Sequence, residues 1–405
     1  MSIFVFETSE LQKMGRIYNF DEKIDRSDTN SLKYDFREKL FGTSDLIPMW
    51  VADMDFRVAD FIVDALKTRM LHEIYGYTLT SERIYEGIIN WIYTRHQWTI
   101  KQEWIGFTPG VVPALNLAVI AFTNPGDKIV IQTPVYPPFY TAAKDHNRQL
   151  VTNPLLLKDG RYTMDFDHLY NQIDDSTKLL VLCSPHNPTG NVWKDDELRE
   201  LAKICIRKNV IIISDEIHAD IVYQGNKHIP MASLSEEISN HVVTLMAASK
   251  TFNFAGLNTS YFIASDRKLF RKLQQTVDKL HLGTCNIFGN IATEAAYRFG
   301  EDWLTQLITY LDNNVDFAEE FINNNIPGVK IIRPEATFLL WTDFRETGLT
   351  EDELRKLIIN KAKLGFSEGS IFGQDGSGFQ RINIGCPKII LESALAQLQK
   401  VLMNQ

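Results

Sequence analysis

The sequence has few cysteines and no excess of basic charge. Four cysteines occur among 405 residues, and no CxxC pair is present. In a chain this long, such spacing argues against a disulfide framework or a zinc site and favours reduced thiols in a cytoplasmic protein. The formal net charge is −9 at pH 7, whereas a nucleic-acid-binding protein usually carries a basic surplus. We therefore expect no nucleic-acid partner.

Long apolar runs are also missing. The apolar stretch from Ile3 to Phe6 is followed at once by Glu7 and has no basic residue before it, which is unlike a signal peptide. The other apolar runs are no longer than a strand, far short of the ~20 residues that span a bilayer. We expect no association with a membrane. The length, with 44% hydrophobic residues, suits two domains.

The middle of the chain reads as alternating strands and helices. Short runs that are apolar throughout are typical of strands covered on both faces of a parallel sheet. They lie at residues 129–131, 179–183, 210–213 and 242–246. Between the second and third run, apolar residues recur with helical spacing from Leu198 to Cys205. This strand, helix and strand predict a βαβ unit, and hence an α/β fold.

The pattern changes after about Gly300. Long helical stretches lead to an expected strand pair, and Thr350 to Glu353 has the form of a capping box ahead of a further helix. A second domain of α+β type is therefore expected here. Its expected parts are a helix over 303–322, strands over 329–332 and 337–341, a loop over 367–378 and a closing helix over 391–402.

Four residues that could carry chemistry follow apolar strands. In open α/β sheets, ligands bind beyond the carboxyl ends of the strands. Lys250 could form a Schiff base, and Asp215 could keep a pyridinium nitrogen protonated. Asn187 could donate to a phenolate oxygen, and Gly110, ahead of a helix start, could offer backbone N–H groups to a phosphate.

Each of the four also has a plain structural interpretation. Lysines are mostly solvated on surfaces, and an aspartate after a strand is often a helix N-cap. Asn187 lies in Ser-Pro-His-Asn-Pro-Thr-Gly, where turn chemistry alone explains an asparagine. Gly110 could be an ordinary junction between a loop and a helix. It is the four together, in this order, that indicate a site.

This arrangement resembles the pyridoxal-5'-phosphate (PLP) enzymes of fold type I, the aminotransferase class I/II superfamily, from about Phe20 to the last helix. Two stretches are similar to the MalY/PatB subgroup of carbon–sulfur lyases, namely IPMWVADMDF from Ile47 and SDEIHAD from Ser214. The resemblance implies an aspartate-aminotransferase-like α/β fold. Its large domain, with a mainly parallel sheet, would span 61–299, and the small α+β domain would combine 1–60 and 300–405.

The resemblance also implies the residues that hold the cofactor. Lys250 would carry PLP as a Schiff base and later remove the substrate Cα proton, while Asp215 would hold the pyridinium nitrogen. The remaining contacts would be to the phenolate oxygen (Asn187, with His218 beside it), the ring face (Tyr136) and the phosphate (Gly110, Val111, Val112 and Ser249). Tyr77 is expected to reach the phosphate in the neighbouring subunit, which implies a homodimer.

On the substrate side, the resemblance implies that Arg381 clamps the α-carboxylate of an amino acid. Arginine suits this task because its planar fork matches a carboxylate. Ala52 and Asn187 would also border the substrate. Asp53 and Asp55 could suggest a metal site, but their apolar neighbours are poor ligands and a structural role is expected, with no metal.

Some positions depart from the wider family, among them Asp28 and Tyr34 in the early segment and two positions close to Lys250. Ala247 stands where many relatives have a phosphate-binding serine, and Asn258 stands where typical aminotransferases have an arginine. The expected reaction is β-elimination from a sulfur amino acid such as cystathionine, giving a thiol, pyruvate and ammonia. An aminotransferase is the alternative, since both reactions begin by removing the same proton. A regulatory, non-enzymatic role is a third hypothesis, which the filled catalytic positions disfavour.

Overall fold

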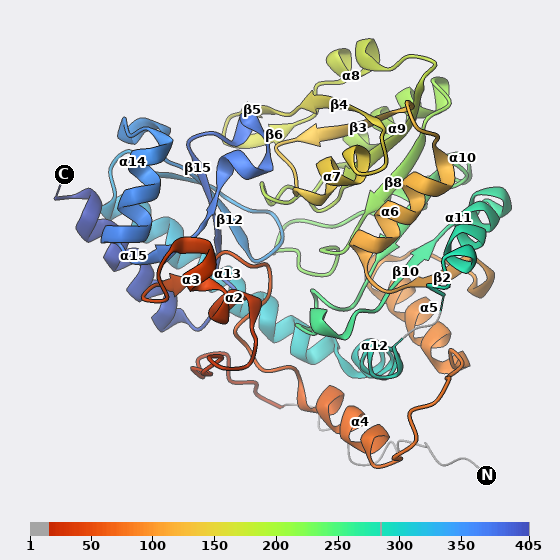
Figure 1. The fold of residues 1–405 in the computed structure, drawn as a ribbon, viewed down its shortest axis with the longest axis horizontal. Helices are drawn as coiled ribbons and strands as arrows, with labels where there is room; N and C mark the ends of the chain where they lie inside the picture. Colours follow the sequence, from red (N-terminus) through yellow and green to blue (C-terminus); the bar gives the residue numbers. More distant parts are fainter. Residues whose placement is uncertain (1–15, 284–285, 405) are drawn as a thin grey trace.

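The computed structural model describes residues 16–283 and 286–404, and it is built around two separate sheets (Figure 1). The expectation about the N-terminal segment and the position of Cys285 lie outside the described residues. Cys183, Cys205 and Cys386 are buried free thiols. Among the described helices, none combines the length and the apolar character needed to cross a membrane.

The larger sheet has seven strands in the order β2-β10-β9-β8-β7-β3-β4. Neighbours from β9 to β4 are parallel, and β10 is antiparallel to both β9 and β2. The bounds are β2 (Ile105–Thr108), β3 (Lys128–Thr133), β4 (Gln149–Pro154), β7 (Thr177–Cys183), β8 (Ile211–Asp215), β9 (Val242–Met246) and β10 (Ser260–Ile263). The four strands predicted from their apolar runs are confirmed. The carboxyl ends of β2, β3, β7, β8 and β9 share one edge.

Both faces of this sheet are covered, which explains the continuous apolar runs at residues 129–131, 179–183 and 211–213 within its strands. Successive residues of β8 point to opposite faces, so that Ile212 packs into one apolar cluster and Ile213 into the other. The Ile213 side holds α6 (Val111–Phe122), α7 (Pro138–Lys144) and α11 (Arg267–Lys279). The opposite side holds α5 (Glu82–His96), α8 (Phe166–Gln172), α9 (Asp195–Arg207) and α12 (Ile287–Phe299).

The predicted βαβ unit is β7, α9 and β8, with parallel strands. Its helix turns Leu198, Leu201, Ala202 and Cys205 into the core, as their spacing predicts. The other helices outside the second sheet are short or connect elements. They are α2 (Leu32–Asp35), α3 (Arg37–Phe41), α4 (Asp60–Met70) and α10 (Glu236–Ser239).

The second sheet has four antiparallel strands in the order β11-β12-β15-β14. The bounds are β11 (Lys330–Ile332), β12 (Leu339–Asp343), β14 (Ser367–Glu368) and β15 (Phe379–Asn383), with α13 (Glu301–Asn325), α14 (Glu351–Lys356) and α15 (Lys388–Leu402) beside them. Two small ladders pair β1 (Ile47–Pro48) with β13 (Leu364–Gly365) and β5 (Leu156–Lys158) with β6 (Arg161–Thr163).

The predicted strand pair is β11 and β12, with the second strand two residues later than expected. The capping box is confirmed, since Thr350 Oγ1 accepts from Glu353 N and Glu353 Oε2 accepts from Thr350 N. The prediction of a loop over 367–378 is wrong at its start, because Ser367 and Glu368 form the edge strand β14. A strand of two residues is too short to show an alternating pattern. The proposed division into domains at 60/61 and 299/300 stays a prediction.

Candidate active site

A pocket of about 220 Å³ opens at the carboxyl edge of the large sheet. It collects loops that follow β2, β3, β7, β8 and β9, as expected where parallel strands end together. Of the site residues predicted from sequence, ten line this pocket. They are Ala52, Gly110, Val111, Val112, Tyr136, Asn187, Asp215, His218, Ser249 and Lys250.

Lys250 lies in the turn after β9 and is the pocket's amine. Its Nζ donates a hydrogen bond to the carbonyl oxygen of Ala52 at 2.6 Å. Burial lowers the pKa of Lys250 to about 8, and the Asp53 carboxylate partly opposes that shift. An amine with this pKa is partly unprotonated near neutral pH, and it is therefore a usable nucleophile and base.

Asp215 is the last residue of β8, rather than lying just beyond the strand. It lies two residues after Ile213, so its side chain points to the same face of the sheet, the one that carries α6. Burial raises the pKa of Asp215 to about 7, although the Ile217 N–H donates to its Oδ1. No cationic side chain among the described residues forms an ion pair with it. A positively charged ligand group there would favour the ionised carboxylate.

The first turn of α6 offers unpaired backbone donors to the pocket. Gly110 precedes the helix with φ of +149°, a conformation that residues with a Cβ rarely adopt. Within the described part of the chain, no side chain caps the N–H groups of Val111 and Val112, which begin the helix. Together with the helix dipole, these donors suit an anion such as a phosphate. Ser249 and Asn258 line the same pocket, whereas Ala247 does not.

Arg381, on β15, lies behind Asn187 and is almost fully buried. It donates to Asn187 Oδ1 at 3.1 Å, to the carbonyl of Trp50 at 2.6 Å and to Ser367 Oγ at 3.3 Å. Its Nε has no hydrogen-bond partner, and Arg381 forms no ion pair with a carboxylate of residues 16–283 or 286–404. Burial lowers the pKa of Arg381 to about 10. A buried guanidinium without a counter-ion is suited to bind a carboxylate ligand.

Two ring-bearing residues complete the lining. Tyr136 is half-buried after β3, and burial raises the pKa of its phenol. Burial, together with the charges of Lys250 and Arg381, lowers the pKa of His218 to about 3, so its imidazole is neutral. The Nδ1 atom of His218 has no partner in the described part of the chain. A ligand oxygen could occupy that position.

Two predicted residues do not line this pocket, namely Arg381, which lies behind Asn187, and Tyr77. Tyr77 is fully exposed, in the connection between α4 and α5. The sequence prediction assigned it to the site of a neighbouring subunit, so its role stays a prediction.

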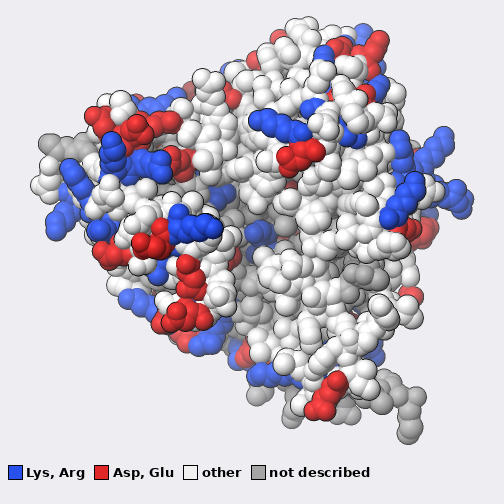
Figure 2. Space-filling view, in the orientation of Figure 1, with Lys and Arg blue, Asp and Glu red and all other residues white. Residues whose placement is uncertain are grey.

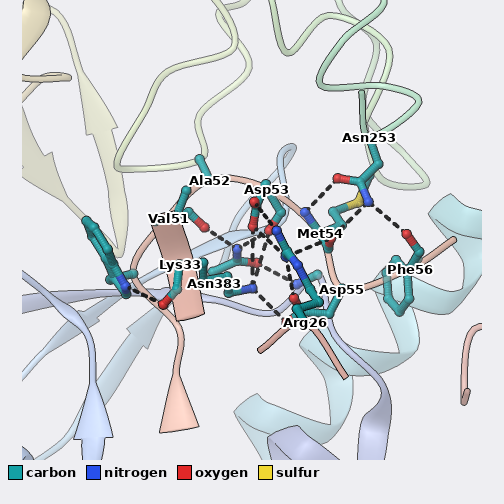
Figure 3. A network of polar contacts seen from close by, with 12 residues as sticks. Arg26, Lys33, Val51, Ala52, Asp53, Met54, Asp55, Phe56, Asn253 and Asn383 are labelled. Atoms are coloured by element: carbon teal, nitrogen blue, oxygen red, sulfur yellow. Dashed lines mark hydrogen bonds and ion pairs between the residues drawn. The ribbon is translucent and has the colours of Figure 1, made fainter. Parts of the chain in front are cut away.

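Sequence reasoning missed the residues that hold the segment from Val51 to Phe56, which Figure 3 shows at close range. Arg26 bonds to the carboxylates of both Asp53 and Asp55, and Lys33 Nζ pairs with Asp55 Oδ2 at 2.7 Å. Lys33 and Asp55 are both buried. The two acids thus have the structural role expected for them, with cationic side chains as partners. Asparagines 253 and 383 bind the same segment through its backbone.

Comparison with known proteins places the chain in a family. The model for "Aminotransferase class I and II" matches residues 51–398. The chain belongs to the aminotransferase class I and II family. The cystathionine beta-lyase PatB of Bacillus subtilis (strain 168) is 43% identical over 385 residues, covering 95% of this chain and all of PatB.

Solved structures agree. Cystalysin from Treponema denticola, which contains PLP, superimposes with a TM-score of 0.93 at 36% identity, covering 96% of this chain and 100% of cystalysin. A PLP-bound protein from Clostridium difficile 630, named only provisionally as an aminotransferase, gives a TM-score of 0.94 at 47% identity over 95% of this chain and all of its own. The predicted fold class and family resemblance are confirmed.

Proposed function

We propose that this protein is a PLP-dependent carbon–sulfur lyase, which eliminates the sulfur substituent from the Cβ of an amino acid such as cystathionine. The observation that carries the proposal is the pocket itself, where an amine of lowered pKa, a buried carboxylate and an uncapped helix start line one cavity. PatB and MalY of Escherichia coli (strain K12), at 43% and 31% identity, support the lyase over the aminotransferase.

The pocket residues fit PLP, because each polar group of the cofactor would find a complementary group in the pocket. The Lys250 amine would bind the aldehyde carbon covalently, and Asp215 would hold the proton of the ring nitrogen. The Val111 and Val112 N–H groups, with the Ser249 hydroxyl, would hold the phosphate. The unpartnered Nδ1 of His218 and the Asn187 amide supply polar contacts for the ring oxygen. When bound, the cofactor supplies an electron sink for the charge that develops at the substrate Cα.

The chain's own residues would bind and orient the substrate. Arg381 would hold the α-carboxylate through its free N–H groups, with its guanidinium already aligned by Asn187 and Trp50. Lys250 would remove the Cα proton, since its pKa of about 8 makes the neutral amine available. Tyr136 would cover the ring face. Because His218 is neutral, it does not repel a proton on Lys250. The Lys250 amine therefore keeps its ability to accept the substrate proton.

A homodimer and a cytoplasmic location are part of the proposal. The connection between α4 and α5, together with the ends of the two helices, exposes a row of apolar side chains, which is unusual for a free surface. They are Met70, Leu71, Ile74, Tyr75, Tyr77 and Leu79. A second copy of the chain would cover this row and bring its Tyr77 to the phosphate.

On the face shown in Figure 2, acidic and basic side chains are interspersed rather than separated.

The decisive experiment uses the purified protein with PLP and cystathionine but no keto acid. The expected result is pyruvate and a free thiol, with no turnover by Lys250→Ala. After borohydride reduction, peptide mass spectrometry should find PLP on Lys250. Turnover that appears only when a keto-acid acceptor is added would make the protein an aminotransferase instead.

A further inference from the structure

The side chain of Asn253 joins the turn that carries Lys250 to the segment from Val51 to Phe56. Its Nδ2 donates to the carbonyls of Met54 and Phe56, both at 2.8 Å, and its Oδ1 accepts from the Met54 N–H at 2.9 Å. Figure 3 shows these three bonds converging on one amide. Both polar atoms of the amide are therefore engaged by a segment about 200 residues away in sequence.

The same two segments meet a second time at the reactive amine. Lys250 Nζ donates to the carbonyl of Ala52, two residues before Met54. Asn253 lies three residues after Lys250, with φ of +59° in the left-handed region, which asparagine tolerates better than most residues. The turn and the segment are thus tied together at both ends of a short span, with the amine at one end and Asn253 at the other.

The segment that Asn253 binds is itself held firmly from the opposite side. Arg26 and Lys33 pair with the side chains of Asp53 and Asp55, and Asn383 Nδ2 donates to the carbonyls of Val51 and Asp53. Because these partners come from two other parts of the chain, the N-terminal segment and the end of β15, the segment is a fixed support. A bond from the Lys250 turn to this support therefore sets where the turn lies.

We propose that Asn253 is a positioning residue for Lys250, holding the amine at the depth in the pocket at which it reacts. The proposal rests on the proposed role of Lys250 as the reacting amine. Asn253 touches neither substrate nor cofactor in this scheme, and it acts only by fixing the Lys250 turn against the 51–56 segment. Without the three bonds, the two segments separate and water reaches the amine.

The test compares Asn253→Gly with the wild type. Glycine keeps the left-handed backbone without strain and removes all three side-chain bonds. In the cofactor-free protein, the rate of acetylation of Lys250 is followed against pH by mass spectrometry. The wild-type profile should have its midpoint near the pKa of about 8 that burial gives the amine. In the variant, renewed hydration should raise that midpoint by about one unit or more.

Activity supplies the second measurement. In the PLP-loaded protein, Asn253→Gly should lower kcat by on the order of 10²-fold and change KM by less than about 3-fold, because the amine is misplaced while the Arg381 site is intact. Asn253→Asp, which keeps the acceptor for Met54 N–H but sets an oxygen against two carbonyls, should lower kcat in the same way. If Asn253→Gly does not fold, Asn253→Asp takes its place in both measurements.

Asn314→Ala is the matched control, since Asn314 Nδ2 also bridges two carbonyls two residues apart, those of Ile384 and Cys386. It should lose stability but keep the wild-type Lys250 profile and kcat. A wild-type profile and kcat in Asn253→Gly would overturn the proposal, and so would an equal shift in Asn314→Ala. If wild-type protein forms no borohydride-stable adduct at Lys250, the proposed function fails, while the acetylation profiles still decide the role of Asn253.

Discussion

The Asp215 carboxylate is expected to reduce the stability of the cofactor-free protein. Burial raises the pKa of Asp215 from 3.8 to about 7. The folded protein therefore binds this proton more tightly than the unfolded chain does. The contribution of Asp215 to stability is greatest below pH 3.8, falls as pH rises, and is lost above about pH 7. The pKa of Asp215 rises by about three units, and each unit corresponds to 1.36 kcal/mol. The free energy of unfolding is therefore lower by about 4 kcal/mol above pH 7 than it would be with an unshifted pKa.

Asp215→Asn removes the charge and keeps an oxygen to accept from Ile217 N–H. The cofactor-free variant should be more stable than the wild type by up to about 4 kcal/mol at pH 8 and by about 2 kcal/mol at pH 5. Urea unfolding, followed by the fluorescence of the tryptophans, measures both differences. The pH dependence is the informative part, because a general packing effect would be the same at both pH values.

Added PLP should reverse the order of stability. The wild-type carboxylate would gain a cationic partner in the ring nitrogen, whereas the amide would not. The same substitution should lower kcat by on the order of 10²-fold or more. If the cofactor-free variant is no more stable than the wild type at pH 8, or if the difference fails to grow between pH 5 and pH 8, the reasoning from burial is refuted.

Three further predictions concern other parts of the chain. Arg381→Lys should raise KM by about 10- to 100-fold with a smaller change in kcat, because a paired N–H contact is lost; an unchanged KM in steady-state kinetics would contradict this. Lys33→Met should cost about 3–5 kcal/mol of unfolding free energy, since Asp55 loses one buried partner, whereas exposed Lys67→Met should cost little. Tyr77→Phe should release PLP faster on dialysis, while sedimentation still finds a dimer; equal retention would exclude Tyr77 from the phosphate site.

Local sequence rules predicted the parts of the fold that depend on neighbouring residues. The apolar runs of β7, β8 and β9 need only burial on both faces, and the capping box at Thr350 needs only a partner three residues away. The position of the pocket was predicted from a topological rule, namely that the carboxyl ends of parallel strands lie at one edge of the sheet. Four predicted residues, Gly110, Asn187, Asp215 and Lys250, could therefore be placed together without knowledge of any long-range contact, whereas the other six that line the pocket came from the family resemblance.

The same rules could not find the support beneath the pocket. Asn253 binds Met54 across 199 positions, and Asn383 binds Val51 across 332. Arg26 and Lys33 carry no local pattern that separates them from solvated cations. The one available signal was Asp53 and Asp55, two acids between apolar neighbours, which predicted a structural role but not the partners. Such contacts are fixed only once the fold brings the N-terminal segment to the Lys250 turn.

The buried charges are paired differently in the pocket and in the support beneath it, which is the 51–56 segment with its partners. Beneath the pocket, every charge has a partner of opposite sign, as Lys33 has Asp55, so the support is stable without a ligand. Within the pocket, neither Arg381 nor Asp215 forms an ion pair with any of the described residues, although burial disfavours the charged form of each. An α-carboxylate and a protonated ring nitrogen are the groups that would satisfy them. The unpaired charges of Arg381 and Asp215 therefore lower the stability of the cofactor-free protein, but they also increase the free energy gained when a ligand pairs with them. The paired charges of the support keep the fold stable in spite of this loss.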